Sequence, residues 1–129
     1  MLVSTTRPAL NAVAIVPREL DGATCSTGLA VLRSDGRILP RYLWYWTQTQ
    51  DFIRPIERSV SGALYPAVSD AEVLEQAVPL PSLKLQTEAV RKLDAEFDMV
   101  ARIAPLVVQA PTFALPAALL RRAFEEVAA

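Results

Sequence analysis

Short apolar runs separated by turn-forming residues make up the first part of the chain. They cover residues 2–6, 12–16 and 28–33, and the first of them is rich in β-branched residues. Pro17 and the dipeptide Asp35-Gly36 follow the second and third runs, and residues of these types end strands. The pattern predicts a small sheet whose first two strands form a hairpin or a bent pair.

Bulky apolar residues at helical spacing mark the next segment, residues 38–53. Pro40 suits the first turn of a helix, and the polar residues 47–50 interrupt the apolar face. We expect a helix, a short break and a second helical piece that carries Arg54 and Arg58. Core packing is favoured over base stacking for the aromatic residues of this segment, because aromatics dominate core energetics. These residues are Tyr42, Trp44, Tyr45 and Trp46.

The stretch from residue 59 to residue 97 joins a compact unit to a long helix. Ser69 and Glu72 have the spacing of a capping box, which predicts a short helix to about residue 76. Pro79 and Pro81 force the residues before them out of the helical region, so we expect a stiff extended joint. Ser82 suits the cap of the long helix. The joint divides the chain into a globular unit, residues 1–81, and a helical region, residues 82–129.

The long helix carries an apolar stripe in alternating steps of three and four residues, the pattern of a coiled-coil seam. The stripe consists of Val90, Leu93, Phe97, Val100, Ala104 and Val107. Pro105 should stop or kink the helix, and a final helix over residues 117–127 should fold back over part of the stripe. The remainder needs a partner, which a second copy of the chain would supply. The predicted partner interface comprises Val90, Leu93, Phe97, Val100, Leu119, Leu120 and Phe124.

Composition removes most catalytic chemistry. The chain of 129 residues has no histidine and a single cysteine, which excludes the commonest general base and an internal disulfide. We expect Cys25 to be a small buried thiol. Asp94, Glu96 and Asp98 fit a solvated helix face better than a metal site, because residues two apart on a helix do not face each other. The sequence also has no glycine-rich phosphate loop, so it predicts no catalytic residue, metal or cofactor.

The sequence favours a cytoplasmic protein. No apolar run reaches the length of a membrane span, and the first residues do not have the pattern of a secretory signal. A lone cysteine fits a reducing compartment.

Charge is distributed unevenly along the chain. Residues 1–67 hold seven arginines and five acidic residues, whereas residues 68–129 hold six basic and nine acidic residues. Polar and basic loop residues in the mildly basic part suit contacts with phosphates and base edges, although ordinary surface loops have the same composition. The candidate DNA contacts are Thr6, Arg7, Asn11, Arg54, Arg58, Ser59, Ser61 and Tyr65.

Five segments are distinctive in their combined order and spacing. They read LVSTTRPALNAVAIVP (2–17), STGLAVLR (26–33), ILPRYLWYW (38–46), SGALYPAVSDAEVLEQAVPLPSLKLQ (61–86) and LPAALLRRAF (115–124). In this order they resemble the C-terminal part of the specificity (S) subunit of bacterial type I restriction–modification systems. The resemblance covers nearly the whole chain.

The resemblance implies a particular fold. Family members have further strands before the segment similar to LVSTTRP, so we expect a partial target recognition domain followed by the conserved helical region. This corresponds to an α/β (α+β) fold with a small mixed sheet, short helices and a coiled-coil-type helical hairpin. In the family two such helices pack antiparallel and act as a ruler between two DNA half-sites.

The resemblance also implies partners and a function. It implies non-catalytic recognition of double-stranded DNA, with the type I methyltransferase (M) subunit and the restriction (R) subunit as protein partners. A second copy of the chain or another S half-subunit would complete the two-domain layout. An alternative from another class stays open, in which the chain is a remnant that acts only as a protein-interaction module through its helices.

Overall fold

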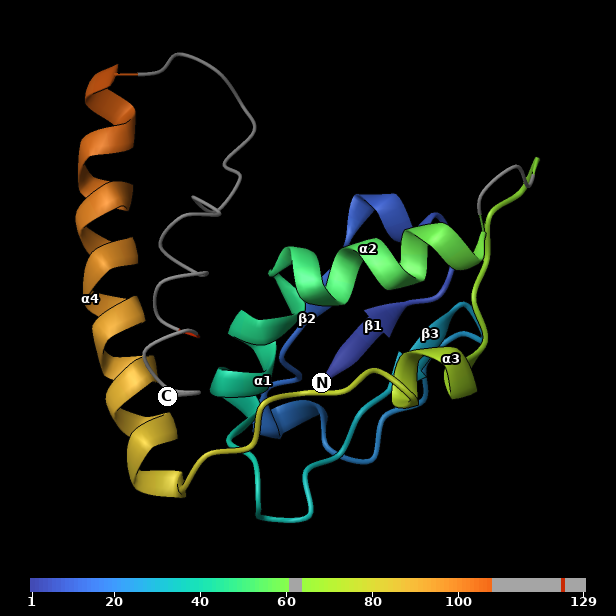
Figure 1. Cartoon of the computed structure of the whole chain (residues 1–129), viewed down its shortest axis with the longest axis horizontal. Helices are drawn as coiled ribbons and strands as arrows, with labels where there is room; N and C mark the ends of the chain where they lie inside the picture. The colour runs from blue at the N-terminus through green and yellow to red at the C-terminus, as the bar shows by residue number, and fades with distance from the viewer. Residues whose placement is uncertain (61–63, 108–123, 125–129) are drawn as a thin grey trace.

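The structure, a computed structural model, describes residues 1–60, 64–107 and 124 of the chain (Figure 1). No helix among these residues is long and apolar enough to cross a membrane. The predicted fold class is confirmed, because a small sheet with short helices is followed by a long helix. The elements are β1 (Leu2–Ser4), η1 (Pro8–Leu10), β2 (Val13–Ala14), η2 (Arg18–Leu20), β3 (Leu29–Val31), α1 (Pro40–Thr47), α2 (Gln50–Ser59), α3 (Asp70–Leu74) and α4 (Leu83–Val107), where η denotes a 3₁₀-helix.

β1 is the central strand of the described sheet, whose order is β2-β1-β3. It pairs antiparallel with both neighbours, so that Val3 lies opposite Val13 on one side and Ala30 on the other. The described sheet is therefore antiparallel rather than mixed as predicted. The physical reason is that the connection from β1 to β2 is shorter than the crossover that a parallel pair requires. Val3 and Ala30 are buried and form the part of the core that the sheet contributes.

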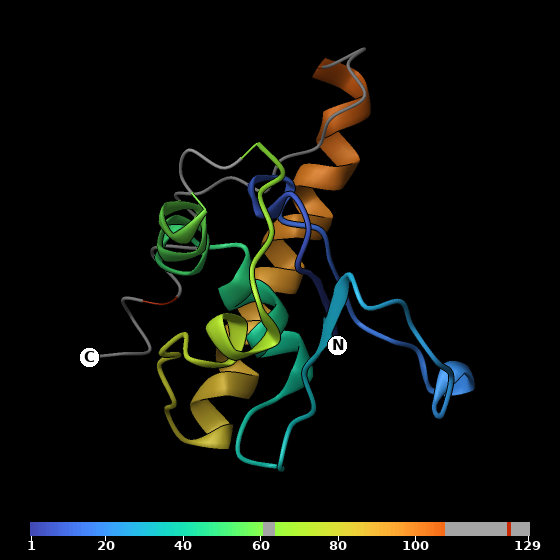
Figure 2. The same cartoon turned by 90° about the vertical axis from the view of Figure 1, so that its right-hand side faces the viewer.

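The connection between β2 and β3 is an arm that stands out from the body, with η2 near its tip (Figure 2). Every residue from 17 to 27 is exposed. Cys25 lies in this arm and is exposed, so the prediction of a buried thiol is wrong. The reason is that the arm is held only at its ends by the pairing of β2 and β3 with β1, and nothing in the described core covers it.

The predicted helix, break and second helix are confirmed as α1 and α2. Pro40 occupies the first turn of α1, as expected for a residue without a backbone donor. The polar break is built into the core, because the buried hydroxyls of Thr47 and Thr49 donate to the carbonyl oxygens of Trp44 and Trp46, both at 2.7 Å. Thr49 then has an extended backbone and precedes α2.

The aromatic side chains of α1 form the core, as the pattern predicted. Tyr42 and Tyr45 are completely buried, and Trp46 is nearly so. Trp46 packs edge to face on Phe52 of α2, with ring centroids 5.1 Å apart. Trp44 is half-buried, and its indole N–H donates to the carbonyl oxygen of Val13 in β2 at 3.3 Å. One short helix thus connects the sheet with the neighbouring helices.

The long helix α4 packs along α1 (Figure 1). The ring of Phe97 stacks on that of Tyr45, with centroids 5.5 Å apart. The Tyr45 hydroxyl donates to the carboxylate of Asp94, and Arg41 donates to the same carboxylate oxygen through Nε at 3.0 Å and Nη2 at 2.8 Å. The Arg41 guanidinium also lies over the Tyr45 ring, 5.0 Å from its centroid. Both apolar and charged contacts therefore hold α4 against α1.

A buried amide, that of Gln86, fixes the start of α4. Its side chain is completely buried, and its Oε1 accepts from the backbone N–H of Leu39 at 2.8 Å. Its Nε2 donates to the carbonyl oxygens of Arg37 and Pro81, both at 2.9 Å. Gln86 thus ties α4 to the entry of α1 and to the proline joint. The Tyr42 hydroxyl adds a bond to the joint by donating to the carbonyl oxygen of Pro79 at 3.2 Å.

The apolar stripe of α4 is largely used within the chain. Leu93 is 1 % exposed and Phe97 is 9 % exposed. The expectation that these residues await a partner is therefore corrected, because both are buried within the chain and Phe97 stacks on Tyr45 of α1. Val90 and Val100 are half-buried. Phe124 is also buried and lies against Tyr42, with ring centroids 5.0 Å apart.

The remaining predictions for the helical region are tested in part. The backbone of α4 continues to Val107, so the helix does not stop at Pro105. The rest of the predicted final helix, including Leu119 and Leu120, lies outside the described residues. The helical hairpin therefore stays a prediction.

The burial of Leu93 generates a prediction with a matched control on the same helix. Leu93→Ala should lower the free energy of unfolding by about 2–5 kcal/mol, since it leaves a cavity between α4 and α1. Leu85→Ala, at a position that is 42 % exposed, should change it by less than about 1 kcal/mol. Urea unfolding followed by circular dichroism measures both. Equal small effects would mean that α4 does not rest on α1.

The two buried tyrosines predict a loss of stability at alkaline pH. Burial raises the pKa of Tyr42 from 10.0 to about 12. Below pH 10 both states keep the proton, whereas between about pH 10 and pH 12 the unfolded chain loses it first and the folded state is disfavoured. Between about pH 8 and pH 11 this change should cost about 1.4 kcal/mol. The pKa of Tyr45 is raised by burial and by its hydrogen bond to Asp94, which adds to the loss.

Urea unfolding of the wild type and of Tyr42→Phe at the two pH values measures the effect. The variant lacks the Tyr42 proton, so its free energy of unfolding should fall less with pH than that of the wild type. Identical pH dependence of the two proteins would contradict the assignment of the effect to Tyr42.

Candidate nucleic-acid interface

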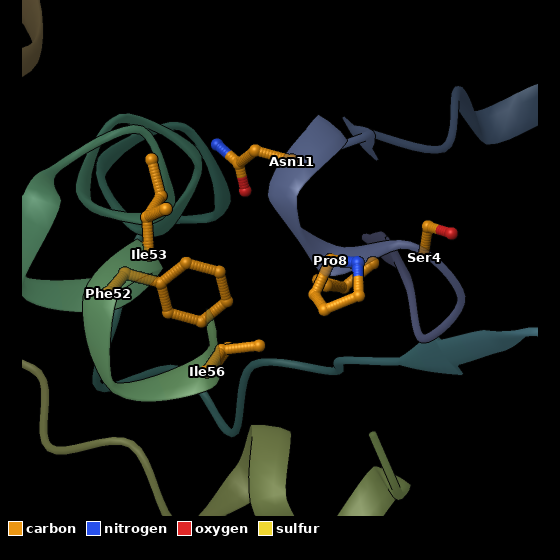
Figure 3. A pocket seen from close by; sticks show the side chains of 7 residues that line it. Ser4, Pro8, Asn11, Phe52, Ile53 and Ile56 are labelled. Carbon is orange, nitrogen blue, oxygen red and sulfur yellow. The ribbon is translucent and has the colours of Figure 1, made fainter. Parts of the chain in front are cut away.

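The junction between η1 and α2 positions most of the predicted DNA contacts. Pro8 opens η1 and is buried against α2, whose Phe52 and Ile56 point toward it (Figure 3). The space left between them has a volume of about 10 Å³, enough for about one water molecule. The candidate site is therefore an exposed surface over a tightly packed junction, not a ligand pocket.

The backbone on both sides of η1 is unusual. Arg7 and Asn11 have φ angles of 49° and 42°, in the left-handed region that L-residues other than Asn and Asp seldom adopt. These two residues let the chain enter and leave the 3₁₀ turn within a few residues. A non-glycine residue such as Arg7 in this region costs about 1–2 kcal/mol and is held there by its surroundings.

Pairing with a distant segment provides those surroundings. The backbone N–H of Arg7 donates to the carbonyl oxygen of Pro66 at 2.9 Å, and Thr6 forms an antiparallel bridge with Ala67. The N–H of Val68 donates to the carbonyl oxygen of Thr5 at 2.8 Å. The extension of β1 is thereby bound to the segment that follows Tyr65. Thr6, Arg7 and Tyr65 are brought to one place, as the hypothesis of a shared surface requires.

Three of the predicted DNA contacts near this junction are arginines. Arg7, Arg54 and Arg58 are exposed and have no ion pair within the described residues. Arg54 donates from Nε to the Gln50 amide oxygen one helical turn earlier, at 3.1 Å. Elsewhere in the globular unit, Arg33, Arg37 and Arg41 are paired with Asp21, Asp35 and Asp94, whereas Arg18 on the arm is exposed and has no ion pair among the described residues. Of the four arginines without an ion pair in the described globular unit, three therefore lie next to η1 or on α2, and α2 also carries the carboxylates Asp51 and Glu57.

Two of the predicted contacts have structural roles. The amide of Asn11 donates to the carbonyl oxygen of Thr47 at 2.9 Å and to the side-chain oxygen of Gln48 at 3.3 Å. The side-chain N–H groups of Asn11 therefore bind the end of α1. A contact with a base edge would need the same N–H groups. The Ser59 hydroxyl donates to the carbonyl oxygen of Ile56 at 2.9 Å. Ser61 lies outside the described residues, so its predicted contact stays a prediction.

The capping box beside this surface is confirmed. The Ser69 hydroxyl accepts from the backbone N–H of Glu72, while the Glu72 carboxylate accepts from the backbone N–H of Ser69 at 2.8 Å. Hydrogen bonds from the Ser69 backbone and hydroxyl, with a smaller one from Ser59, hold the pKa of Glu72 below its usual value. The Glu72 carboxylate is thus engaged at the start of α3.

Sequence reasoning missed Leu64, which is 87 % exposed beside Tyr65 at 86 %. The available signal was a run from residue 59 to residue 69 without a charged residue, which contains a leucine and a tyrosine next to each other. It also missed the role of Pro8 as the residue that seats η1 on α2.

A solved structure has a similar fold over most of this chain. The chain is similar to the HsdS subunit from Thermoanaerobacter tengcongensis, whose crystal structure it matches with a TM-score of 0.72 and 34 % sequence identity over 81 % of its length. HsdS is the specificity subunit of type I restriction–modification systems, so the predicted resemblance to that family is confirmed. The match covers 27 % of the HsdS chain, which means that this chain corresponds to about a quarter of that subunit. No family model and no curated protein matches the chain.

The two roles considered for Asn11 give different outcomes on mutation. Asn11→Ala should lower the free energy of unfolding by about 1–3 kcal/mol, because the Thr47 carbonyl loses its donor and alanine is strained at positive φ. Asn11→Gly removes the same bonds without that strain and should cost less. Urea unfolding measures both variants. Unchanged stability together with a large loss of DNA affinity would instead make Asn11 a base contact.

Proposed function

We propose that the chain is a DNA-recognition part of a type I specificity subunit, or a half-subunit of that kind. It binds double-stranded DNA and directs methyltransferase and endonuclease subunits to it, without catalysis of its own. In this proposal residues 1–81 form the recognition unit and residues 82–129 form the helical region on which the methyltransferase subunit docks. The similarity to HsdS over most of the chain supports the proposal.

The single observation that carries the DNA contact is the set of unpaired arginines on one junction. Arg7, Arg54 and Arg58 belong to two elements that pack together, and none has an ion pair within the described residues. Exposed guanidinium groups bind phosphate oxygens, and the release of counterions from DNA makes such binding favourable. Phosphate contacts of this kind set the orientation of a protein on the duplex. Thr6 and Tyr65, beside Arg7, are then placed toward a groove.

The second function, a protein-interaction module that does not contact DNA, has its own supporting observation. Several large apolar residues of the joint and of α4 remain exposed, although the central stripe is covered. They are Leu80 at 49 %, Leu83 at 47 %, Leu85 at 42 % and Met99 at 63 %. These residues suit contacts with the methyltransferase subunit or a second specificity half-subunit. Both proposed functions require protein contacts at these exposed apolar residues. Only DNA recognition also requires contacts made by Arg7, Arg54 and Arg58.

Salt dependence separates the two functions. Arg7→Gln, Arg54→Gln and Arg58→Gln should each weaken binding to duplex DNA and lower the slope of log K against log salt by about one unit. Fluorescence anisotropy with a labelled duplex over a range of salt concentrations measures the slope. Arg33→Gln is the matched control, since Arg33 is paired with Asp21 away from this surface and its loss should leave the slope unchanged. Unchanged slopes in all four variants would contradict DNA recognition by these arginines and leave the protein-interaction module as the remaining function.

A further inference from the structure

Leu64 and Tyr65 are exposed far beyond what a free surface favours. At 87 % and 86 % they are the most exposed large hydrophobic residues of the described chain, and they are adjacent. Single exposed apolar residues are common, but two side by side at nearly full exposure are unfavourable in water unless a partner covers them. Nothing in the described chain does so.

The backbone after these residues is fixed, so their exposure is imposed on them. Pro66 keeps Tyr65 out of the helical region. The carbonyl of Pro66 and the backbone of Ala67 are then bound to Arg7 and Thr6. Val68 is 7 % exposed and is the residue by which this segment enters the core. Leu64 and Tyr65 therefore directly precede a segment whose backbone is hydrogen-bonded to Arg7 and its neighbours.

The surroundings of the pair match duplex DNA better than an apolar protein surface. The segment 59–69 has no charged residue, and Arg7, Arg54 and Arg58 flank it without an ion pair among the described residues, alongside the carboxylates Asp51 and Glu57 of α2. An apolar tip bordered by arginines can place its side chains among the bases while the arginines bind the adjacent phosphates. Proteins that kink DNA insert leucine and similar side chains between base pairs in this way, and aromatic rings stack on the exposed bases.

We infer that Leu64 and Tyr65 form a wedge that enters the duplex at one base step, unstacks it and bends the DNA. The inference rests on the proposed function, and it adds a mode of recognition to the phosphate contacts. The energy of unstacking depends on the sequence of the step, with pyrimidine–purine steps the easiest to open. The wedge therefore contributes to target choice through the deformability of the DNA.

The test uses the full chain and a duplex enriched from a random-sequence pool by the wild type. The fluorescent base 2-aminopurine, which pairs with thymine, replaces each adenine of either strand of that duplex in turn, because its emission rises when it is unstacked. Wild-type protein should raise the emission several-fold at one step. The double variant Leu64→Ser, Tyr65→Ser should abolish the rise and weaken binding about tenfold or more, with an unchanged salt slope, because no phosphate contact is lost. Leu20→Ser is the matched control, a leucine that is 54 % exposed on the distant arm.

The outcomes separate the inference from the function on which it rests. DNA binding with no change in emission, or with equal affinity in the double variant, overturns the wedge and leaves DNA recognition in place. Failure of the wild type to enrich any duplex overturns both. Since both substituted residues are exposed, thermal unfolding should give the same midpoint for all variants, and this measurement verifies that the loss is not one of folding.

Discussion

The hydrogen-bonded side chain of Gln86 is the constraint on which the arrangement of the two parts depends. A buried amide is costly unless its donors and acceptor are satisfied, and here all are: Leu39 donates to it, and Arg37 and Pro81 accept from it. Apolar contacts between α4 and α1 would tolerate a shift of one helix along the other. A shift of a single turn, about 5.4 Å, would leave these groups without partners. Gln86 therefore fixes the register that Leu93 and Phe97 stabilise.

This constraint changes the interpretation of the proline joint. Pro79 and Pro81 make the connection extended, but side chains on both sides of it set the angle between the globular unit and α4. Gln86 acts at the start of the helix, and Asp94 acts two turns later, where it accepts from Tyr45 and Arg41. The globular unit and the helix therefore share one core. The two roles proposed for residues 1–81 and 82–129 are therefore assigned to parts of one packed unit.

Local patterns predicted the elements well, and long-range contacts account for the failures. Prolines, the polar break and the capping box located α1, α2 and α3, because these signals act within a few residues. The periodicity of α4 predicted that one face is buried, but not that α1 of the same chain buries it. The role of Asn11 was likewise decided by partners far away in the sequence, whereas Cys25 is exposed because no part of the described core covers its arm. The candidate site was predicted in composition, since Arg7, Arg54 and Arg58 are exposed, but the bridge that brings Tyr65 to Arg7 has no local signal.

The arm between β2 and β3 has a consequence for chain connectivity. β2 and β3 lie on opposite sides of β1, and every residue from 17 to 27 is exposed. A break in this arm would remove no buried contact. The first piece would remain attached through the pairing of β1 with β3, the seat of Pro8 on α2 and the bonds of Asn11 to the end of α1. The covalent link contributes mainly the entropy of loop closure, which changes slowly with length, so the same fold is open to insertion in the arm or to assembly from two separate polypeptides.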